Sequence, residues 1–196
     1  MKVLILGGTG MLGHRLWVDL SSTYEVMATV RRPTPRINLP CFSGVDVLDF
    51  RTVESAFHEF HPEVVINCVG VIKQRTGISK QVAGSTDYLK SIELNSVLPH
   101  KLAQLCDSNH SRLIHVSTDC VFDGKKGNYA DTDEPNSCDL YGRTRALGEI
   151  NYTQNAVTLR TSLVGKSLET SSNLIDWFLS QRGKKITGFD LSLIHI

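Results

Sequence analysis

The sequence predicts an α/β protein built on a doubly wound parallel sheet. Two features of the chain lead to this prediction. Short, continuous apolar runs alternate with segments whose apolar residues recur every three or four positions, and a glycine-rich turn follows the first apolar run. Continuous apolar strands are typical of parallel sheets that are buried on both faces, and right-handed crossovers between them place helices on both sides.

The order of these segments is strand, helix, two strands, helix, strand, helix, strand, helix, strand. Apolar runs predict strands at residues 3–6, 26–30, 45–48, 64–71, 113–117 and 157–164. Helical spacing of apolar residues predicts helices at residues 11–20, 53–60, 92–106 and 141–152. Pro99 falls inside the third helix, where it either starts a kink or belongs to a first turn. Residues 72–90 are polar and contain glycine, which is typical of a mobile loop at the carboxyl edge of the sheet.

The composition is that of a globular protein and excludes several classes. The chain has 196 residues, of which 41% are hydrophobic and 21% charged, and its formal net charge is +1. A dedicated nucleic-acid binder normally carries a basic excess, and a membrane span needs about 18 consecutive apolar residues, so neither partner is expected. The apolar run at residues 3–6 is too short for a secretory signal, and we expect the cytosol as the compartment. The 5 cysteines form no C-x-x-C pair, so neither a disulfide framework nor a metal site is expected.

A glycine-rich segment follows the first predicted strand and opens the first predicted helix. Residues 7–13 are GGTGMLG, a G-x-x-G-x-x-G variant of the dinucleotide-binding fingerprint. In this context, backbone N–H groups at a helix N-terminus approach a pyrophosphate. A P-loop interpretation fails because His14 and Arg15 stand where Lys and Ser/Thr are needed, and a tight turn without ligand is the other alternative. We therefore predict cofactor contacts from Gly7, Thr9, Gly10, Met11, Leu12 and Gly13.

Two arginines follow the second predicted strand, at the place where a carboxylate would hold the ribose 2′-OH of NAD. Arg31 and Arg32 stand there instead. Because guanidinium groups pair with phosphate, they favour NADP, with NAD as the second choice; the alternative is a solvated surface pair. Asp46 and Val47 end the next predicted strand. Asp46 is a candidate acceptor for the adenine amine, or a plain carboxylate at a strand end.

Two further motifs carry groups for proton transfer. Thr118 follows a predicted strand, and Tyr141 precedes Arg145 by four positions on a predicted helix. Positions i and i+4 share a helix face, so the cation of Arg145 would stabilise the phenolate of Tyr141. With the Thr118 hydroxyl on the same substrate oxygen, these residues predict a catalytic site for carbonyl reduction. A Tyr–Arg pair alone is usually a surface pair, so the prediction of a catalytic site depends on the other motifs as well.

These motifs resemble those of the extended short-chain dehydrogenase/reductases. Within that superfamily the chain is similar to the dTDP-4-dehydrorhamnose reductases and related nucleotide-sugar reductases of surface polysaccharide biosynthesis. The resemblance extends over residues 1–188 and rests on six segments in the family's order: GGTGMLG (7–13), VVINCVG (64–70), ELNS (93–96), STDCVFDG (117–124), DLYGRTRALGE (139–149) and LRTSLVG (159–165). It implies a Rossmann-like domain followed by a small substrate domain. It also implies hydride transfer from a reduced nicotinamide to the 4-keto group of a nucleotide-linked deoxysugar.

The resemblance assigns roles to individual residues. Tyr141 matches the family's proton donor, and Thr118 matches its active-site Ser/Thr. Asn95 matches a helix asparagine of the active site, although it could also cap or pack. Cofactor contacts are implied for Asn67, Cys68, Val69, Gly70, Asn95, Tyr141 and Arg145. Substrate contacts are implied for Val71, Thr118, Asp119, Cys120, Arg160 and Thr161.

The chain departs from the family pattern in two places. The family has Lys where Arg145 stands, so the charge is kept while the planar guanidinium is larger. The family's substrate domain also continues beyond the length of this chain. We expect a nucleotide-binding domain at residues 1–168 and an incomplete substrate domain at 169–189, with a helix at 172–182 and a strand starting at 185–187. Residues 190–196 are expected to be a non-native tail, and the chain is expected to bind cofactor with an incomplete substrate pocket.

Two other functions remain open on the same scaffold, because a fold alone does not decide an activity. One is a non-catalytic, NADP-binding regulatory subunit, which Arg145 favours and which the intact Thr118 and Tyr141 argue against. The other is a nucleotide-sugar epimerase or dehydratase. A dehydratase would need a carboxylate where Cys120 stands. The expected partner is a nucleotide-sugar substrate, and a homodimer is left open.

Overall fold

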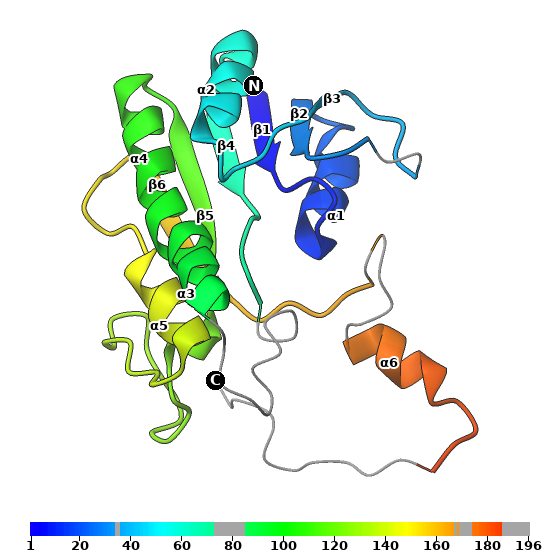
Figure 1. The fold of residues 1–196 in the computed structure, drawn as a ribbon, viewed down its shortest axis with the longest axis vertical. Helices are drawn as coiled ribbons and strands as arrows, with labels where there is room; N and C mark the ends of the chain where they lie inside the picture. Colours follow the sequence, from blue (N-terminus) through cyan, green and yellow to red (C-terminus); the bar gives the residue numbers. More distant parts are fainter. Residues whose placement is uncertain (34–35, 73–84, 167, 169–173, 186–196) are drawn as a thin grey trace.

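The computed structural model shows a six-stranded parallel sheet with helices on both faces (Figure 1). It describes residues 1–33, 36–72, 85–166, 168 and 174–185. The strands are β1 (Lys2–Leu6), β2 (Glu25–Val30), β3 (Cys41–Ser43), β4 (Val64–Asn67), β5 (Arg112–Thr118) and β6 (Ala156–Thr161). Their order across the sheet is β3-β2-β1-β4-β5-β6, and every adjacent pair is parallel. The predicted doubly wound, Rossmann-like fold is confirmed.

Two apolar clusters hold the helices on opposite faces of the sheet. Helix α1 (Met11–Leu20) covers one face, where Trp17 packs with Val3 and Ile5. Helices α2 (Phe50–Phe60) and α4 (Leu98–Ser108) cover the other face, against Leu4 and Leu6. The alternation along β1 therefore sends successive side chains to different helices. The same central strand is buried on both sides, which explains its uninterrupted apolar sequence.

The start of helix α5 (Leu140–Leu147) is defined by a side-chain cap. Asp139 occupies the N-cap position, and its carboxylate accepts a hydrogen bond of 2.8 Å from the N–H of Gly142. Helix α1 begins differently, because its N-cap is Gly10, which has no side chain to accept a bond. The first-turn N–H groups of α1 consequently receive no side-chain cap.

Two predicted strands end earlier than expected or lie elsewhere. Residues 45–48 were predicted as a strand, but β3 precedes them and Gly44, with φ +78°, ends it. Asp46 then accepts a hydrogen bond from the N–H of Leu48, which closes a turn. The strand predicted to continue to residue 71 ends at Asn67, whose side chain accepts from the N–H of Val69 at 3.1 Å. Both corrections arise because short polar side chains compete with the strand ladder.

The predicted helix at 141–152 ends at Leu147, and the predicted strand at 157–164 ends at Thr161. Residues 92–106 form two elements, a π-helix at Ile92–Val97 and then α4, whose first turn contains Pro99. The predicted loop at 72–90 contains helix α3 (Ser85–Ser91), while residues 73–84 lie outside the described part. Within the predicted helix at 172–182, α6 (Leu174–Ser180) is described. Residues 186–187 of the predicted strand start and the predicted tail at 190–196 also lie outside the described residues.

The five cysteines are all free. Cys106 is a residue of α4 that is buried in the core, while Cys68 directly follows β4 and is half-buried. Burial raises the pKa of the Cys68 and Cys106 thiols to about 12. In the described part of the chain, no helix has the length and apolar character required to cross a bilayer.

Candidate functional site

A cleft of about 260 Å³ lies at the carboxyl edge of the sheet. It is centred where β1 and β4 are neighbours, which is the switch point of a doubly wound sheet and its usual ligand position. Segments that follow β1, β2, β3 and β4 form its walls together with α3. The lining residues are Gly7, Thr9, Gly10, Thr29, Val30, Arg31, Val45, Asp46, Val47, Leu48, Cys68, Val69, Gly70, Val71, Lys90 and Leu94.

The glycine-rich turn is shaped to bring backbone close to a ligand. Gly7 has φ +84°, and the N–H of Gly8 donates to the carbonyl of Thr29 at 3.0 Å. A Cβ at Gly13 would overlap the carbonyl oxygen of Gly7, so this glycine is needed for the helix to pack on the turn. The first turn of α1 has no acidic residue and no side-chain cap. Its N–H groups and helix dipole therefore suit an anionic group such as a diphosphate.

Only one of the two arginines that are predicted to bind the 2′-phosphate lines the cleft. Arg31 and Arg32 are both exposed, and of the two only Arg31 is among the lining residues. Asp46 and Val47 line the cleft, and their role at an adenine stays a prediction. Lys90 and Leu94 also line it, from the segment that follows β4, and neither is among the residues predicted from the sequence. Their only local signal is the four-residue spacing across a predicted loop and helix, which does not by itself point to a ligand.

Two buried asparagines hold the wall that follows β4. Asn67 is fully buried and accepts from the N–H of Val69, and its amide nitrogen lies 3.1 Å from Nδ1 of His115. Asn95, in the π-helix, accepts from the N–H of Val71 at 2.8 Å and donates to the Val71 carbonyl at 3.2 Å. The burial of both asparagines gives them a packing role; contact with a cofactor stays a prediction. A π-helical turn is a recurrent feature of functional sites.

His115 is fully buried beside this wall. Burial, and then the positive charge of Arg145, lower its pKa to about 3. The ring is therefore neutral at physiological pH, and its Nδ1 is an acceptor for the amide of Asn67. His115 thus orients Asn67 without carrying charge.

Arg145 lies inside the protein, directly behind Gly70. Its side chain is 7% exposed, its Nη2 donates to the carbonyl of Val116, and a Cβ at Gly70 would be 2.6 Å from its Nη1. Burial lowers the pKa of Arg145, while attraction to Tyr141 and Glu149 acts in the opposite direction. The predicted pairing of the Arg145 cation with the Tyr141 phenol stays a prediction.

Thr118 and Tyr141 meet the same region from two elements. Thr118 ends β5 and caps the short 3-10 helix Asp119–Val121, and its hydroxyl donates to Asp119 at 3.1 Å and accepts from the N–H of Cys120 at 3.2 Å. The start of α5 lies against this turn, because a Cβ at Gly142 would overlap the carbonyl of Cys120. Tyr141 is half-buried at this junction. The structure thus places the predicted catalytic residues at adjoining ends of β5 and α5.

Arg160 and Thr161 have protein partners of their own. Arg160 forms an ion pair with Glu149 at 2.8 Å, and its Nη1 donates to the carbonyl of Asp131 at 3.0 Å. The Thr161 hydroxyl donates to the carbonyl of Ser117. Arg160 therefore fastens the 131–133 loop to the sheet edge, and the predicted substrate contacts of both residues stay untested.

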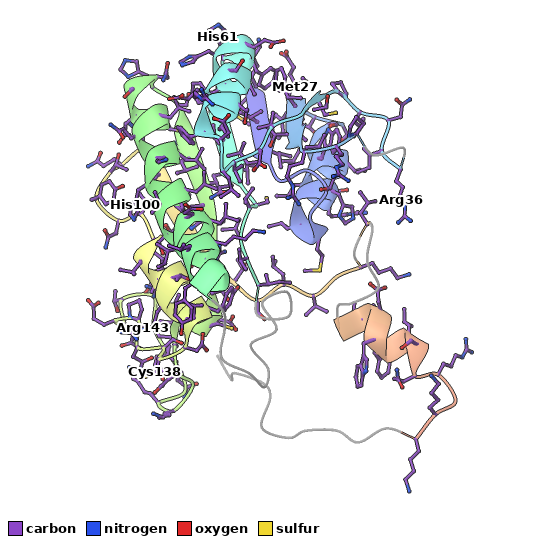
Figure 2. All side chains as sticks on the ribbon, viewed as in Figure 1. Met27, Arg36, His61, His100, Cys138 and Arg143 are labelled. Atoms are coloured by element: carbon purple, nitrogen blue, oxygen red, sulfur yellow. The ribbon has the colours of Figure 1, made fainter. Side chains whose placement is uncertain are left out.

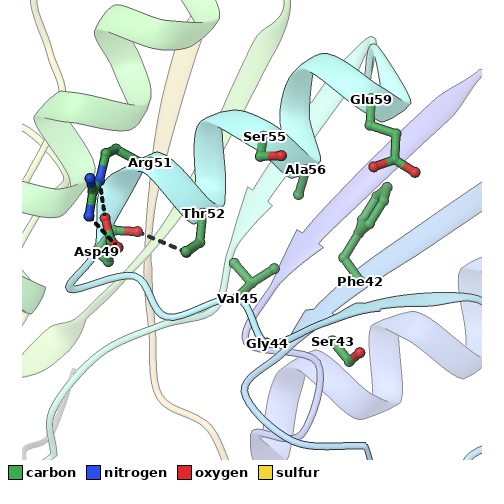
Figure 3. Close-up of a pocket in the computed structure, with 10 residues that line it drawn as sticks. All are labelled: Phe42, Ser43, Gly44, Val45, Asp49, Arg51, Thr52, Ser55, Ala56 and Glu59. Carbon is green, nitrogen blue, oxygen red and sulfur yellow. Dashed lines mark hydrogen bonds and ion pairs between the residues drawn. The ribbon is translucent and has the colours of Figure 1, made fainter.

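A larger hollow of about 440 Å³ lies between β3 and α2 (Figure 3). Its charged groups include Asp49 and Arg51, which are exposed and paired with each other at 2.9 Å. Phe42, Val45 and Ala56 contribute apolar surface. Gly44 lines this hollow, but no helix N-terminal glycine-rich segment does, and none of its polar lining residues is buried, so the smaller cleft is the candidate site. Among the described residues, no group of three or more His, Cys, Asp or Glu is arranged to hold a metal ion.

The family comparison agrees with this geometry. The family described as RmlD substrate binding domain matches residues 1–185. The chain belongs to this RmlD family.

Two curated proteins illustrate the range of RmlD-like relatives. Methionine adenosyltransferase 2 subunit beta of Rattus norvegicus is 31% identical over 156 residues, which are 79% of this chain and 43% of that protein. The probable low-salt glycan biosynthesis reductase Agl14 of Haloferax volcanii is 28% identical over 180 residues, 89% of this chain and 57% of that protein. The chain spans about half the length of the curated relatives that it matches.

Solved structures show the same RmlD-like architecture. A hypothetical dTDP-4-dehydrorhamnose reductase from Sulfolobus tokodaii superposes with a TM-score of 0.67 at 29% identity, over 82% of this chain and 55% of that chain. A dTDP-4-dehydrorhamnose reductase from Bacillus anthracis, in complex with NADP, has a TM-score of 0.58 at 21% identity, over 75% and 47% of the two chains. The second likeness concerns the fold alone.

Proposed function

We propose that this chain is the nucleotide-binding part of an NADP-dependent reductase that acts on the 4-keto group of a nucleotide-linked deoxysugar. One observation carries the proposal. A single cleft combines an uncapped helix N-terminus with Arg31, and the wall at Gly70 brings that cleft to the helix that bears Tyr141 and Arg145. The two relatives described as reductases support the same chemistry.

The glycine turn and Arg31 bind the cofactor in this proposal. The turn at Gly7 and Gly10, with the N-terminus of α1, receives the diphosphate. Arg31 pairs with the 2′-phosphate, which distinguishes NADP from NAD. When bound, the reduced nicotinamide supplies the hydride.

Tyr141 delivers the proton. As the carbonyl carbon is reduced, negative charge develops on its oxygen, and the phenol of Tyr141 protonates that oxygen. The buried cation of Arg145 stabilises the phenolate that remains. The hydroxyl of Thr118, which donates to Asp119 in this structure, turns to the same oxygen and polarises it.

Cofactor titration tests the proposal. NADPH is added to the protein and its fluorescence is followed, with NADH in parallel. We expect NADPH to bind more tightly, and Arg31→Ala to weaken NADPH by about 10- to 100-fold, as for loss of a charged hydrogen bond, while leaving NADH unchanged. Turnover is then measured as NADPH oxidation with dTDP- and UDP-linked 4-keto sugars on a chain extended to the length of its relatives, and Tyr141→Phe should abolish it in that chain. Absence of affinity for both cofactors would overturn the proposal.

A second candidate is a non-catalytic, NADP-binding regulatory subunit. The similarity to methionine adenosyltransferase 2 subunit beta and the buried arginine at position 145 favour it. On this hypothesis the chain extended to the length of its relatives binds NADPH but oxidises it with none of the keto sugars. It would also coelute with a methionine adenosyltransferase catalytic chain on size exclusion, which the reductase hypothesis does not require.

A further inference from the structure

We propose that Arg145 is a positioning residue that supports the Gly70–Val71 wall of the cleft from inside the protein, and that Gly70 and Arg145 form an interdependent pair. The proposal rests on the proposed function, because this wall belongs to the same nucleotide site. Arg145 stands where the family pattern has lysine.

The guanidinium of Arg145 is buried and lies next to Gly70. Both Nε and Nη1 of Arg145 are buried and have no hydrogen-bond acceptor among the residues that the structure describes. Nη1 lies behind Gly70, not within the cleft that Gly70 lines. Arg145 is not among the residues that line the cleft, and a direct contact from it to the cofactor ribose, implied by the family resemblance, stays a prediction.

Arg145 makes a hydrogen bond to Val116 near the end of β5. The pairing between β4 and β5 ends with Asn67 opposite His115, so the next residue of β5, Val116, has no partner in β4. Nη2 of Arg145 donates to the Val116 carbonyl at this point. The guanidinium therefore bonds the end of β5 where the backbone ladder stops, and its Nη1 packs behind Gly70 without a hydrogen bond. A planar guanidinium can donate to Val116 through one nitrogen while another fills the space behind Gly70, whereas an ammonium group is more compact.

Residue 70 has no room for a side chain next to Arg145. A Cβ at Gly70 would lie 2.6 Å from Nη1 of Arg145, 3.2 Å from Oδ1 of Asn95 and 3.4 Å from Cζ of Arg145. Two of these three atoms belong to the guanidinium, which is held in place by its bond to Val116. Even alanine at position 70 must therefore displace Arg145 or move the wall. The glycine and the arginine fit each other, although they are far apart in the sequence.

A double-mutant cycle tests the pair. The variants are Gly70→Ala, Arg145→Lys and the double variant, with Arg143→Lys as a control on the exposed side of the same helix (Figure 2). Thermal unfolding without cofactor measures the contact itself. NADPH titration of the folded proteins measures the positioning of the wall.

We expect strong coupling in both measurements. Gly70→Ala should weaken NADPH binding by about tenfold or more when Arg145 is present. In the Arg145→Lys background the same change should weaken binding by less than about threefold, because the smaller head group leaves room for the Cβ. The melting temperature should fall with Gly70→Ala and recover at least partly in the double variant. If Gly70→Ala fails to fold while the double variant folds, that rescue supports the pair.

Other outcomes overturn the proposal. Additive effects in both cycles would show that residues 70 and 145 act independently, and failure of the double variant to fold would show that Gly70 is needed for another reason. An equal effect from Arg143→Lys would show that the changes are not specific to the pair. If the wild-type protein binds no NADPH, the proposed function fails, and the unfolding cycle alone then decides whether Gly70 and Arg145 are coupled.

Discussion

Replacement of Asn95 by alanine tests the support beneath the cleft. Asn95 is fully buried, and its side chain makes three hydrogen bonds, two with the backbone of Val71 and one of 3.2 Å to the hydroxyl of Thr144. A buried hydrogen bond contributes about 1 kcal/mol net, and a partner left unsatisfied costs about 1–3 kcal/mol. Val71 is half-buried, so water can replace part of its bonding. We therefore expect Asn95→Ala to lower the free energy of unfolding by about 3 kcal/mol.

The assay is equilibrium unfolding in urea together with thermal melting. For a chain of this size, 1 kcal/mol corresponds to about 2–4 °C, so the melting temperature should fall by about 6–12 °C. The matched control is Asn109→Ala at the end of α4, where the exposed side chain donates one bond of 2.8 Å to the Leu105 carbonyl. Its effect should stay below about 1 kcal/mol.

The cofactor affinity of folded Asn95→Ala should also fall, because the backbone of Val71 then loses both of its side-chain partners. Asn109→Ala should bind NADPH like the wild type. Equal losses of stability in the two variants would refute the reasoning, since they would show that the bonds to Val71 and Thr144 add nothing beyond an ordinary surface contact.

Two further predictions follow from single positions. Gly13→Ala should abolish NADPH binding in a fluorescence titration, because its Cβ would overlap the carbonyl of Gly7 and open the turn, whereas Gly165→Ala meets ordinary contacts and should be tolerated. His115 has a folded-state pKa of about 3 against an ordinary value of 6.5. Between these values the unfolded chain binds the proton and the folded chain does not, so stability should fall as the pH is lowered from about 6.5. In His115→Gln, whose amide oxygen can still accept from Asn67, urea unfolding from pH 7 to pH 4 should show a smaller slope; an unchanged slope would contradict the assignment to His115.

The sequence predicted the architecture because the signals that determine it are local. The apolar run of β1 and the amphipathic pattern of α2 each belong to one continuous segment. The predictions failed where a polar side chain redirects the backbone. Val45 is buried and apolar, as in a strand, yet the bond from Leu48 to Asp46 makes a turn there. Asn67 likewise ends β4 within a run of apolar residues.

The same distinction between local and non-local signals applies to the residues of the candidate site. The glycine turn could be predicted because its function depends on backbone shape at one place in the chain, and Arg31 could be predicted because it directly follows a strand. Lys90 lines the cleft through the packing of α3, and no local pattern specifies that. For Arg160, the sequence indicated the correct strand, although β6 ends at Thr161 and not at residue 164, and the partner of its guanidinium, Glu149, belongs to the segment after α5.

Arg145 shows why a departure from a family motif has to be interpreted together with its surroundings. Considered alone, an arginine in place of lysine suggests a damaged site or a lost activity. In the fold it donates to Val116 at the end of β5 and lies behind Gly70, where the absence of a Cβ leaves space for the larger head group. Attraction to Tyr141 acts to raise the pKa of Arg145, although burial lowers it overall. An altered motif position is compatible with function when the fold has room for the new side chain. Here Gly70 leaves that room and Val116 supplies one acceptor, while Nε and Nη1 have none among the described residues.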